Sequence, residues 1–175
     1  TLMPGTALVS DVDVIVLGSG TSSGIPVIGC SCRVCTSEDP RDRRLRTAGA
    51  SRFLDATGTP RTLLIDASPD LRQQSLAHAL TRCDGILLTH NHVDHTFGLD
   101  EVRRFNAVMQ QPIDLYADEH TMSFLYRTFQ HIFSPERNIN PSFVASIIPH
   151  VLAAPASVDL FGLRCTVIPL LHGRL

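Results

Sequence analysis

The stretch Thr89-His90-Asn91-His92-Val93-Asp94-His95 places three imidazoles and one carboxylate within six consecutive positions. In an extended segment, residues i and i+2 project to the same side, so His90 and His92 can bind one cation. A turn that follows would bring Asp94 and His95 to a second position close by. The spacing therefore predicts a centre for two metal ions.

The apolar run Gly85-Ile86-Leu87-Leu88 stands directly before this cluster and predicts a short buried strand. A single histidine is usually an ordinary core or surface residue. Four side chains of ligand type at one strand end would need several unrelated explanations, so a metal site is the better interpretation. Imidazole and carboxylate suit zinc and, less selectively, manganese, iron or nickel, which leaves the identity of the metal open.

The composition predicts one domain with a real core, because the chain has 175 residues of which 43% are hydrophobic. No apolar run has the length that a membrane span needs, and residues 1–5 lack the features of a secretory signal, so we expect a cytoplasmic protein. The net charge of −2 requires neither a nucleic acid nor a membrane surface as a partner. A local group of arginines either meets an anionic substrate or forms a solvated face; its members are Arg41, Arg43, Arg44 and Arg46.

Five cysteines occur in the chain, and three of them lie within six residues, at Cys30, Cys32 and Cys35. An odd count with this spacing argues against a disulfide framework, whereas Cys-x-Cys-x-x-Cys can place its sulfurs around one tetrahedral ion. We therefore predict a structural zinc whose fourth ligand comes from elsewhere. The alternative is a redox pair of Cys32 and Cys35. Cys83 and Cys165 have apolar surroundings and are expected to be inert core thiols.

The N-terminal half has the pattern of strands and one helix. A strand is expected at 13–18, followed by a glycine-containing loop at 19–24; the loop does not fit a dinucleotide-binding turn, because no helix can start after it. A hairpin is expected from 51–53 and 61–67. Ser68-Pro69-Asp70 then predicts the start of a helix that continues to about Leu80, with an apolar face of Leu71, Ser75, Leu76, Ala79 and Leu80.

After the histidine cluster, apolar residues at helical spacing predict a helix that carries Leu99, Val102, Phe105, Val108 and Met109. A strand at 113–117, a helix that begins after Asp118, and strands near 146–148 and at 163–170 follow. His172 comes directly after the last of these strands. Strands alternating with helices indicate an α/β or α+β protein, with the cluster at the carboxyl end of a strand, where such proteins usually place their chemistry.

The motif His90-Asn91-His92-Val93-Asp94-His95 resembles the His-x-His-x-Asp-His motif of the metallo-β-lactamase superfamily, with Asp66 and His172 in the expected order around it. Within that superfamily, the loop at 18–21, the cysteine segment at 29–35 and the segment 98–106 resemble the PhnP-like phosphodiesterase branch. The resemblance implies the N-terminal portion of an αββα sandwich spanning residues 1–175, with a dinuclear centre at one edge.

Carried over residue by residue, the resemblance implies that His90, His92 and His172 bind the first metal, and that Asp94 and His95 bind the second. Asp66 would support these ligands without touching a metal. It also implies that Cys30, Cys32 and Cys35 hold a structural zinc. The expected cofactors are thus two divalent ions, zinc or manganese, at the active site and one structural zinc.

The family pattern continues beyond His172 with a bridging aspartate, a further histidine of the second metal and a histidine that completes the structural zinc. The sequence stops at Leu175, so we expect these ligands to lie in a longer protein and the domain to be incomplete at its C-terminus; the alternative is that a partner completes both sites. As given, the chain is expected to bind metal weakly.

The function implied by the resemblance is hydrolysis of a small or cyclic phosphodiester, with Asp94 orienting the nucleophile. Three alternatives stay open: a tRNA 3′-end endonuclease, which the near-neutral charge disfavours, a thioester or lactam hydrolase, and a non-catalytic metal-binding module. The expected partner is a small-molecule phosphodiester rather than a nucleic acid or a membrane, and a homodimer is compatible with the sequence. The acid that protonates the leaving group is unassigned. The resemblance implies that it lies beyond residue 175 or is one of His120, His131 and His150, although each of these three is better explained as a structural or surface residue.

Overall fold

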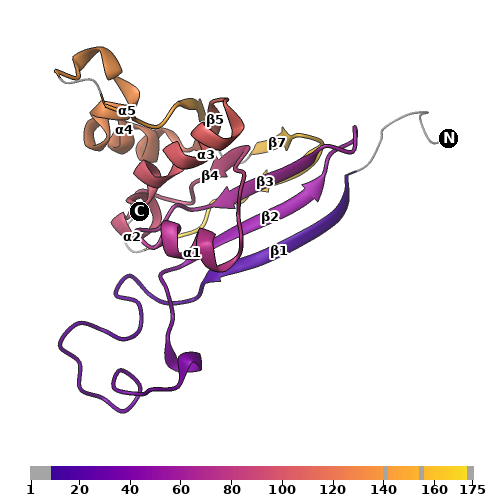
Figure 1. Ribbon diagram of the computed structural model, residues 1–175. Coiled ribbons are helices and arrows are strands. Elements are labelled where there is room, and N and C mark those ends of the chain that lie inside the picture. Colours follow the sequence, from indigo (N-terminus) through magenta and orange to yellow (C-terminus); the bar gives the residue numbers. More distant parts are fainter. Residues whose placement is uncertain (1–8, 140–141, 154–155, 173–175) are drawn as a thin grey trace.

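A computed structural model describes residues 9–139, 142–153 and 156–172. Its centre is a mixed sheet of six strands in the order β1-β2-β3-β4-β5-β6 (Figure 1). The strands of this sheet are β1 (Ser10–Gly18), β2 (Ala48–Leu54), β3 (Pro60–Ile65), β4 (Gly85–Leu87), β5 (Ile113–Ala117) and β6 (Ile147–Val151). Strands β1 to β3 pair antiparallel and β3 to β6 pair parallel, so the sheet changes character at β3.

The predicted hairpin is confirmed as β2 and β3, although β2 begins three residues earlier than expected. Its turn is organised by Asp55, whose carboxylate accepts hydrogen bonds from the backbone N–H groups of Thr57 and Thr59 at 2.8 and 3.0 Å. A carboxylate that bonds the backbone two residues ahead is a common way to set a tight turn. The hairpin places Asp66, the first residue after β3, beside the end of β4.

Helices cover one face of the six-stranded sheet (Figure 1). They are α1 (Leu71–Ala77), α2 (Val93–Thr96), α3 (Arg103–Met109), α4 (Glu119–Thr128) and α5 (Gln130–Phe133), with short 3₁₀ turns at Pro40–Asp42, Leu99–Val102 and Pro135–Arg137. Between helices and sheet lies the main core, whose largest fully buried side chains include Leu64, Leu71, Ile86, Leu99 and Leu115. Alternate residues of β3 to β5 point into it, as the period of a strand requires.

The opposite face of the sheet packs against a second, two-stranded sheet formed by β7 (Ala156–Leu160) and β8 (Leu163–Val167). Phe53, Leu63 and Leu160 form the buried centre of this contact. The layers are therefore helices, large sheet and small sheet, and they correspond to three of the four layers of the predicted αββα sandwich. Within the described residues, no helix covers the outer side of the small sheet.

The first predicted helix is shorter than expected, because α1 begins at Leu71 and ends at Ala77. The Asp70 carboxylate does not cap it; instead it accepts hydrogen bonds from the backbone N–H and the guanidinium of Arg46, each at 2.8 Å. The predicted apolar face was also partly wrong, since Leu76 is 66% exposed while the polar Gln74 is fully buried. Gln74 is satisfied there by Ser68 and by the carbonyl of Arg46.

Later elements differ in detail from the prediction. The helix expected around Leu99–Met109 is a 3₁₀ turn followed by α3, and Val108 lies exposed on it. The helix after Asp118 is confirmed, with the Asp118 carboxylate accepting from the Thr121 N–H at 2.8 Å, but it breaks at Phe129 into α4 and α5. Strand β7 was not predicted. No helix among the described residues is long and apolar enough to cross a membrane.

Candidate metal centre

The histidine cluster lies in the loop that connects β4 to α2, with His92 as the residue before the first turn of α2. The rings of His90 and His92 are 4.5 Å apart between centroids, and those of His90 and His95 are 4.1 Å apart. The extended loop followed by a helical turn thus has the local shape that the sequence predicted. It places the rings of His92 and His95 next to the ring of His90.

His172 joins this group from the far end of the described chain. Its ring centroid lies 4.9 Å from that of His90 and 5.2 Å from that of His92. One potential ligand atom from each of His90, His92 and His172 falls within 4.8 Å of the other two. The three residues predicted to share the first metal are therefore brought together, although His172 is separated by 80 positions in the sequence from His92.

His90 is the most enclosed of the three. Its Nε2 is buried and has no hydrogen-bond partner among the described residues. Burial and the neighbouring imidazoles of His95 and His92 lower the pKa of His90 below the ordinary histidine value. A buried nitrogen without a hydrogen-bond partner is costly unless a water molecule or a metal ion satisfies it. A neutral imidazole with a free lone pair is the form in which histidine binds a metal, so this atom fits a ligand role.

Asp94 and His95 lie beside the first group. Asp94 is in the first turn of α2, and its Oδ2 is 3.4 Å from His95 Nε2. A carboxylate oxygen and an imidazole nitrogen are ligand types that bind divalent cations, and at this distance the two atoms are close enough to share one ion. The five predicted ligands therefore occupy one end of the sheet, and their donor set of nitrogen and oxygen fits divalent transition metals. Their assignment as ligands stays a prediction.

Asp66 is buried and supports the histidine cluster through hydrogen bonds from the loop that carries it. Its backbone has a φ of 63°, in the left-handed region that aspartate tolerates better than most side chains. This turn aims the carboxylate along the loop, where it accepts hydrogen bonds from the Thr89 N–H at 2.8 Å and from His95 Nδ1 at 2.7 Å. Asp66 was predicted to support the ligands, and its contact with His95 fits that role. The hydroxyl of Thr89, which no sequence pattern singled out, also contacts Asp66.

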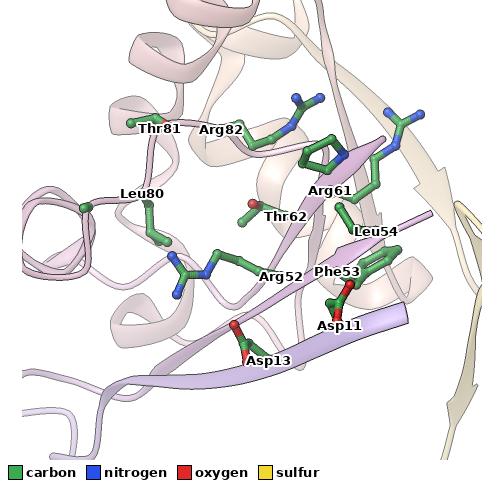
Figure 2. A pocket seen from close by; sticks show the side chains of 12 residues that line it. Asp11, Asp13, Arg52, Phe53, Leu54, Arg61, Thr62, Leu80, Thr81 and Arg82 are labelled. Carbon is green, nitrogen blue, oxygen red and sulfur yellow. The ribbon is translucent and has the colours of Figure 1, made fainter. Parts of the chain in front are cut away.

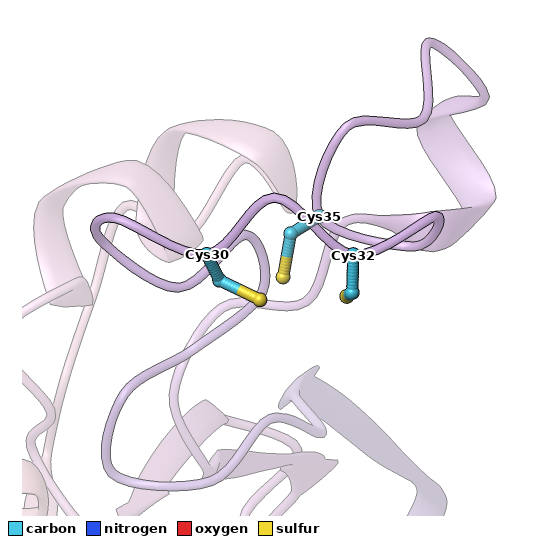
Figure 3. Close-up of side chains that lie close together, drawn as sticks. All are labelled: Cys30, Cys32 and Cys35. Atoms are coloured by element: carbon cyan, nitrogen blue, oxygen red, sulfur yellow. The ribbon is translucent and has the colours of Figure 1, made fainter.

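The second group of potential ligands lies in the long loop between β1 and β2. Cys30, Cys32 and Cys35 have sulfurs within 4.8 Å of one another, and Figure 3 shows the three side chains on the same side of the loop. The Cys35 backbone N–H and the Cys30 thiol lower the pKa of Cys32 to about 7. Although the Val27 N–H favours its thiolate, burial and the neighbouring thiols raise the pKa of Cys35. Three clustered sulfurs fit one tetrahedral zinc that takes a further ligand.

Two glycines at the start of this loop, Gly18 and Gly20, lie very close to backbone atoms at the end of the same loop. A Cβ on Gly18 would lie 2.0 Å from the Arg46 carbonyl oxygen, and one on Gly20 would lie 2.8 Å from the Leu45 carbonyl oxygen. Gly20 also donates its N–H to Leu45 at 2.8 Å. The glycines thus permit close backbone pairing between the two ends of the loop, which carries the cysteines away from the sheet (Figure 1).

His131 and His150 have partners away from the histidine cluster, whereas the partner of His120 is Asn91, which lies between the predicted ligands His90 and His92. His131 contacts Asp100 at 2.8 Å and His150 contacts Asp114 at 2.7 Å. His120 lies 3.3 Å from the side-chain nitrogen of Asn91. Cys83 is fully buried and Cys165 half-buried, and burial raises the pKa of both thiols, which agrees with the expected inert core role.

A surface groove of about 380 Å³ lies near the start of β3 and the segment before β4 (Figure 2). Arg52, Arg61 and Arg82 line it together with Asp11 and Asp13. Because the histidine cluster follows the carboxyl end of β4, this groove is at the opposite end of the parallel strands. It contains none of the predicted ligands.

The arginines of the long loop are partly engaged. Arg41 is paired with Asp39 at 2.7 Å and Arg46 with Asp70 at 2.8 Å. The Arg46 pair ties the loop to the start of α1, so this residue has a structural explanation. Arg43 and Arg44 are exposed.

Comparison with known proteins identifies similar chains. A family model described as a beta-lactamase superfamily domain matches residues 61–175. A protein of Porphyromonas gingivalis named octanoyltransferase is 41% identical over 165 residues, covering 92% of this chain and 31% of that protein. The crystal structure of a diphosphatase from the PhnP family superposes with a TM-score of 0.81 at 36% identity, covering 96% of this chain and 60% of that chain.

Zinc-bound PqqB from Methylobacterium extorquens is a second structural neighbour, with a TM-score of 0.65 and 26% identity. The match covers 90% of this chain and 55% of PqqB. The chain thus spans about a third of the octanoyltransferase relative and little more than half of each of these two structures.

Proposed function

The chain belongs to the metallo-β-lactamase superfamily, in its PhnP-like branch. On this premise we propose that it forms part of a metal-dependent hydrolase that acts on small or cyclic phosphodiesters. The observation that supports the proposal is the convergence of His90, His92 and His172, in which the buried Nε2 of His90 has no hydrogen-bond partner among the described residues. Asp94 and His95 beside them supply the donors for a second ion. Two adjacent divalent cations are a common arrangement in enzymes that hydrolyse phosphate esters.

When bound, the cations would supply a nucleophile near neutral pH and neutralise charge on a phosphoryl oxygen. The residues of this chain would hold the two ions and orient the attacking water. His90, His92 and His172 would fix the position of one ion, and Asp94 and His95 that of the other. The Asp94 carboxylate would also accept a hydrogen bond from the attacking water and so orient it. Asp66 would hold His95 in place through the Nδ1 contact of 2.7 Å.

A second candidate substrate class is a diphosphate, because the PhnP-family neighbour with 36% identity is a diphosphatase. Hydrolysis of a phosphoanhydride and of a phosphodiester places the same kind of charge on the same phosphoryl oxygens. The same donor set can serve both. The two substrates differ in the leaving group, which is a phosphate in one case and an alkoxide in the other.

Other activities have less support. An RNA endonuclease would need a basic surface for the phosphate backbone, whereas the chain carries a net charge of −2 and half of its arginine group is ion-paired. Thioester or lactam hydrolysis, and metal binding without turnover, are compatible with the fold but have no supporting contact in this structure.

The test is an assay of the intact protein on bis(p-nitrophenyl) phosphate and on a diphosphate such as a nucleoside diphosphate ester, each with added Mn²⁺ or Zn²⁺. We expect metal-dependent hydrolysis of at least one of them. His92→Ala should reduce it to background, because the change removes a predicted ligand.

The matched control is His78→Ala, at the C-terminal end of α1 and outside the cluster, which should keep the rate of the unchanged protein. Hydrolysis that survives in His92→Ala would contradict the proposal. Stoichiometric metal binding without turnover on either phosphate substrate would instead favour a non-catalytic module.

A further inference from the structure

The Thr89 hydroxyl lies between the Asp66 carboxylate and the imidazole of His90. Thr89 Oγ1 is 3.0 and 2.9 Å from the two carboxylate oxygens of Asp66, and it is 2.9 Å from Nδ1 of His90. His95 Nδ1 contacts the same carboxylate at 2.7 Å. Asp66 is therefore linked to two imidazoles, directly to His95 and through one hydroxyl to His90.

The direction of these hydrogen bonds follows from what each group can donate. A carboxylate only accepts, so the single hydroxyl proton of Thr89 has to point to Asp66; otherwise its lone pairs would face those of two carboxylate oxygens at about 3 Å. The Thr89 oxygen can then only accept from His90. The proton of the neutral His90 ring is thereby held at Nδ1.

With its proton at Nδ1, His90 presents a bare lone pair at Nε2. This is the atom that is buried and without a partner in the described structure. The same logic applies to His95, where donation from Nδ1 to Asp66 leaves Nε2 facing Asp94 at 3.4 Å. The hydrogen bond on one ring nitrogen decides which nitrogen is free for a metal.

We propose that Thr89 is a positioning residue of the metal centre. Its hydroxyl donates to Asp66 and accepts from Nδ1 of His90, and this relay fixes the His90 tautomer that offers Nε2 to the first metal. The inference rests on the proposed function in so far as it concerns metal binding. The tautomer itself is a property of the metal-free protein. Thr89 touches neither substrate nor metal in this role.

The clean variant is Thr89→Val, which keeps the shape of the side chain and removes only the hydroxyl. The backbone N–H of residue 89 still donates to Asp66 in this variant, and His95 still contacts the other oxygen, so the carboxylate stays anchored. Thr89→Ser is the matched control, because it restores a hydroxyl at the same place. Thr89 is exposed, which limits the effect of the exchange on packing.

The first measurement is the ¹⁵N NMR spectrum of the metal-free intact protein at a pH where the imidazoles are neutral. We expect His90 to carry its proton at Nδ1 in the unchanged protein and in Thr89→Ser, and to lose this preference in Thr89→Val. His95 should keep its tautomer in all three, since its bond to Asp66 does not involve residue 89. A His90 tautomer that is the same in Thr89→Val would overturn the relay.

The second measurement is the affinity for Co²⁺, followed by its visible absorption. Thr89→Val should weaken binding by about 10- to 100-fold, as is usual when a residue that orients a ligand is lost, and Thr89→Ser should restore it. Equal affinity of all three proteins would overturn the role in metal binding. If the unchanged protein binds no Co²⁺ at the histidines, the proposed function fails, while the NMR result still decides the relay.

Discussion

At the scale of single residues, Asp66 combines a backbone and a side-chain requirement. Its φ of 63° needs a residue that tolerates the left-handed region, and its carboxylate needs to accept from Thr89 and His95. Asparagine tolerates the same backbone but cannot act as a full acceptor with two anionic oxygens. The two requirements can therefore be separated by substitution.

Asp66→Asn should fold and should weaken metal binding by about 10- to 100-fold, because the ligands lose their orienting carboxylate while the backbone keeps its conformation. Asp66→Ala should additionally lower the free energy of unfolding by about 1 kcal/mol or more, because alanine is strained at this φ. Zinc titration and urea unfolding of both variants measure the two effects. Unaltered zinc affinity in Asp66→Asn would show that the carboxylate does not support the ligands.

Asp84 has a comparable role at the other end of the sheet. Its side chain is 1% exposed and contacts Arg61 at 3.1 Å and Arg82 at 2.7 Å, and it accepts from the Thr62 N–H at 2.8 Å. Burial by itself would raise the pKa of Asp84, but these donors hold it below the ordinary value. The carboxylate thus joins the start of β3 to the segment before β4.

Asp84→Asn should lower the free energy of unfolding by about 2 kcal/mol near neutral pH, since it removes the carboxylate that pairs with Arg82 and one of the two that pair with Arg61. Because the pKa of Asp84 is lowered by folding, the stabilisation is present above the ordinary carboxyl pKa and is lost as the pH falls through the folded-state value. The difference between variant and unchanged protein should therefore shrink in acid. Urea unfolding from pH 7 downwards, with the exposed Glu38→Gln as control, checks this; a pH-independent difference would count against it.

At the scale of elements, the long loop between β1 and β2 is a separate unit built on the cysteines. If Cys30, Cys32 and Cys35 hold zinc, then Cys32→Ser should remove about one equivalent of metal from the intact protein, as a single tetrahedral site requires. Hydrolysis at the histidine centre should persist. Cys165→Ser in β8 is the control and should leave the metal content unchanged. Equal metal content in Cys32→Ser would defeat the structural zinc.

The elements also show what a sequence pattern can predict. The strand before His90, the hairpin that ends at Asp66 and the strand at Ile113–Ala117 could be predicted because short apolar segments stand there between turn residues. The helix predicted after Ser68 was longer than α1. The sequence pattern could not reveal that Asp70 pairs with Arg46 or that Gln74 is buried with polar partners. The contacts of Asp70 and Gln74 with Arg46 join residues 24 and 28 positions apart and are settled only by the tertiary structure.

The site divides in the same way. The six-residue motif predicted His90, His92, Asp94 and His95 as neighbours, because their spacing alone brings them together. The approach of His172 to His90 required the known order of the family motif. The Thr89 hydroxyl could not be singled out, because a threonine before a histidine is unremarkable until its distances to Asp66 and His90 are known.

At the scale of the whole molecule, the layers place the two predicted metal sites on loops around a rigid sheet. The histidine cluster lies in the loop between β4 and α2, at the carboxyl ends of the parallel strands. On the far edge, Val12, Val14 and Val16 of β1 are 47–76% exposed in the described structure. A parallel sheet core that supports loops at its carboxyl edge is a common setting for catalysis.

The central claim is that the histidine cluster binds divalent metal. Its most direct test is anomalous X-ray scattering from crystals of the intact protein grown with Zn²⁺ or Mn²⁺. We predict one peak bounded by His90, His92 and His172, with Nε2 of His90 among the ligands, and a second peak beside Asp94 and His95. A map with no peak at the histidines, while the cysteine loop is occupied, would contradict the claim.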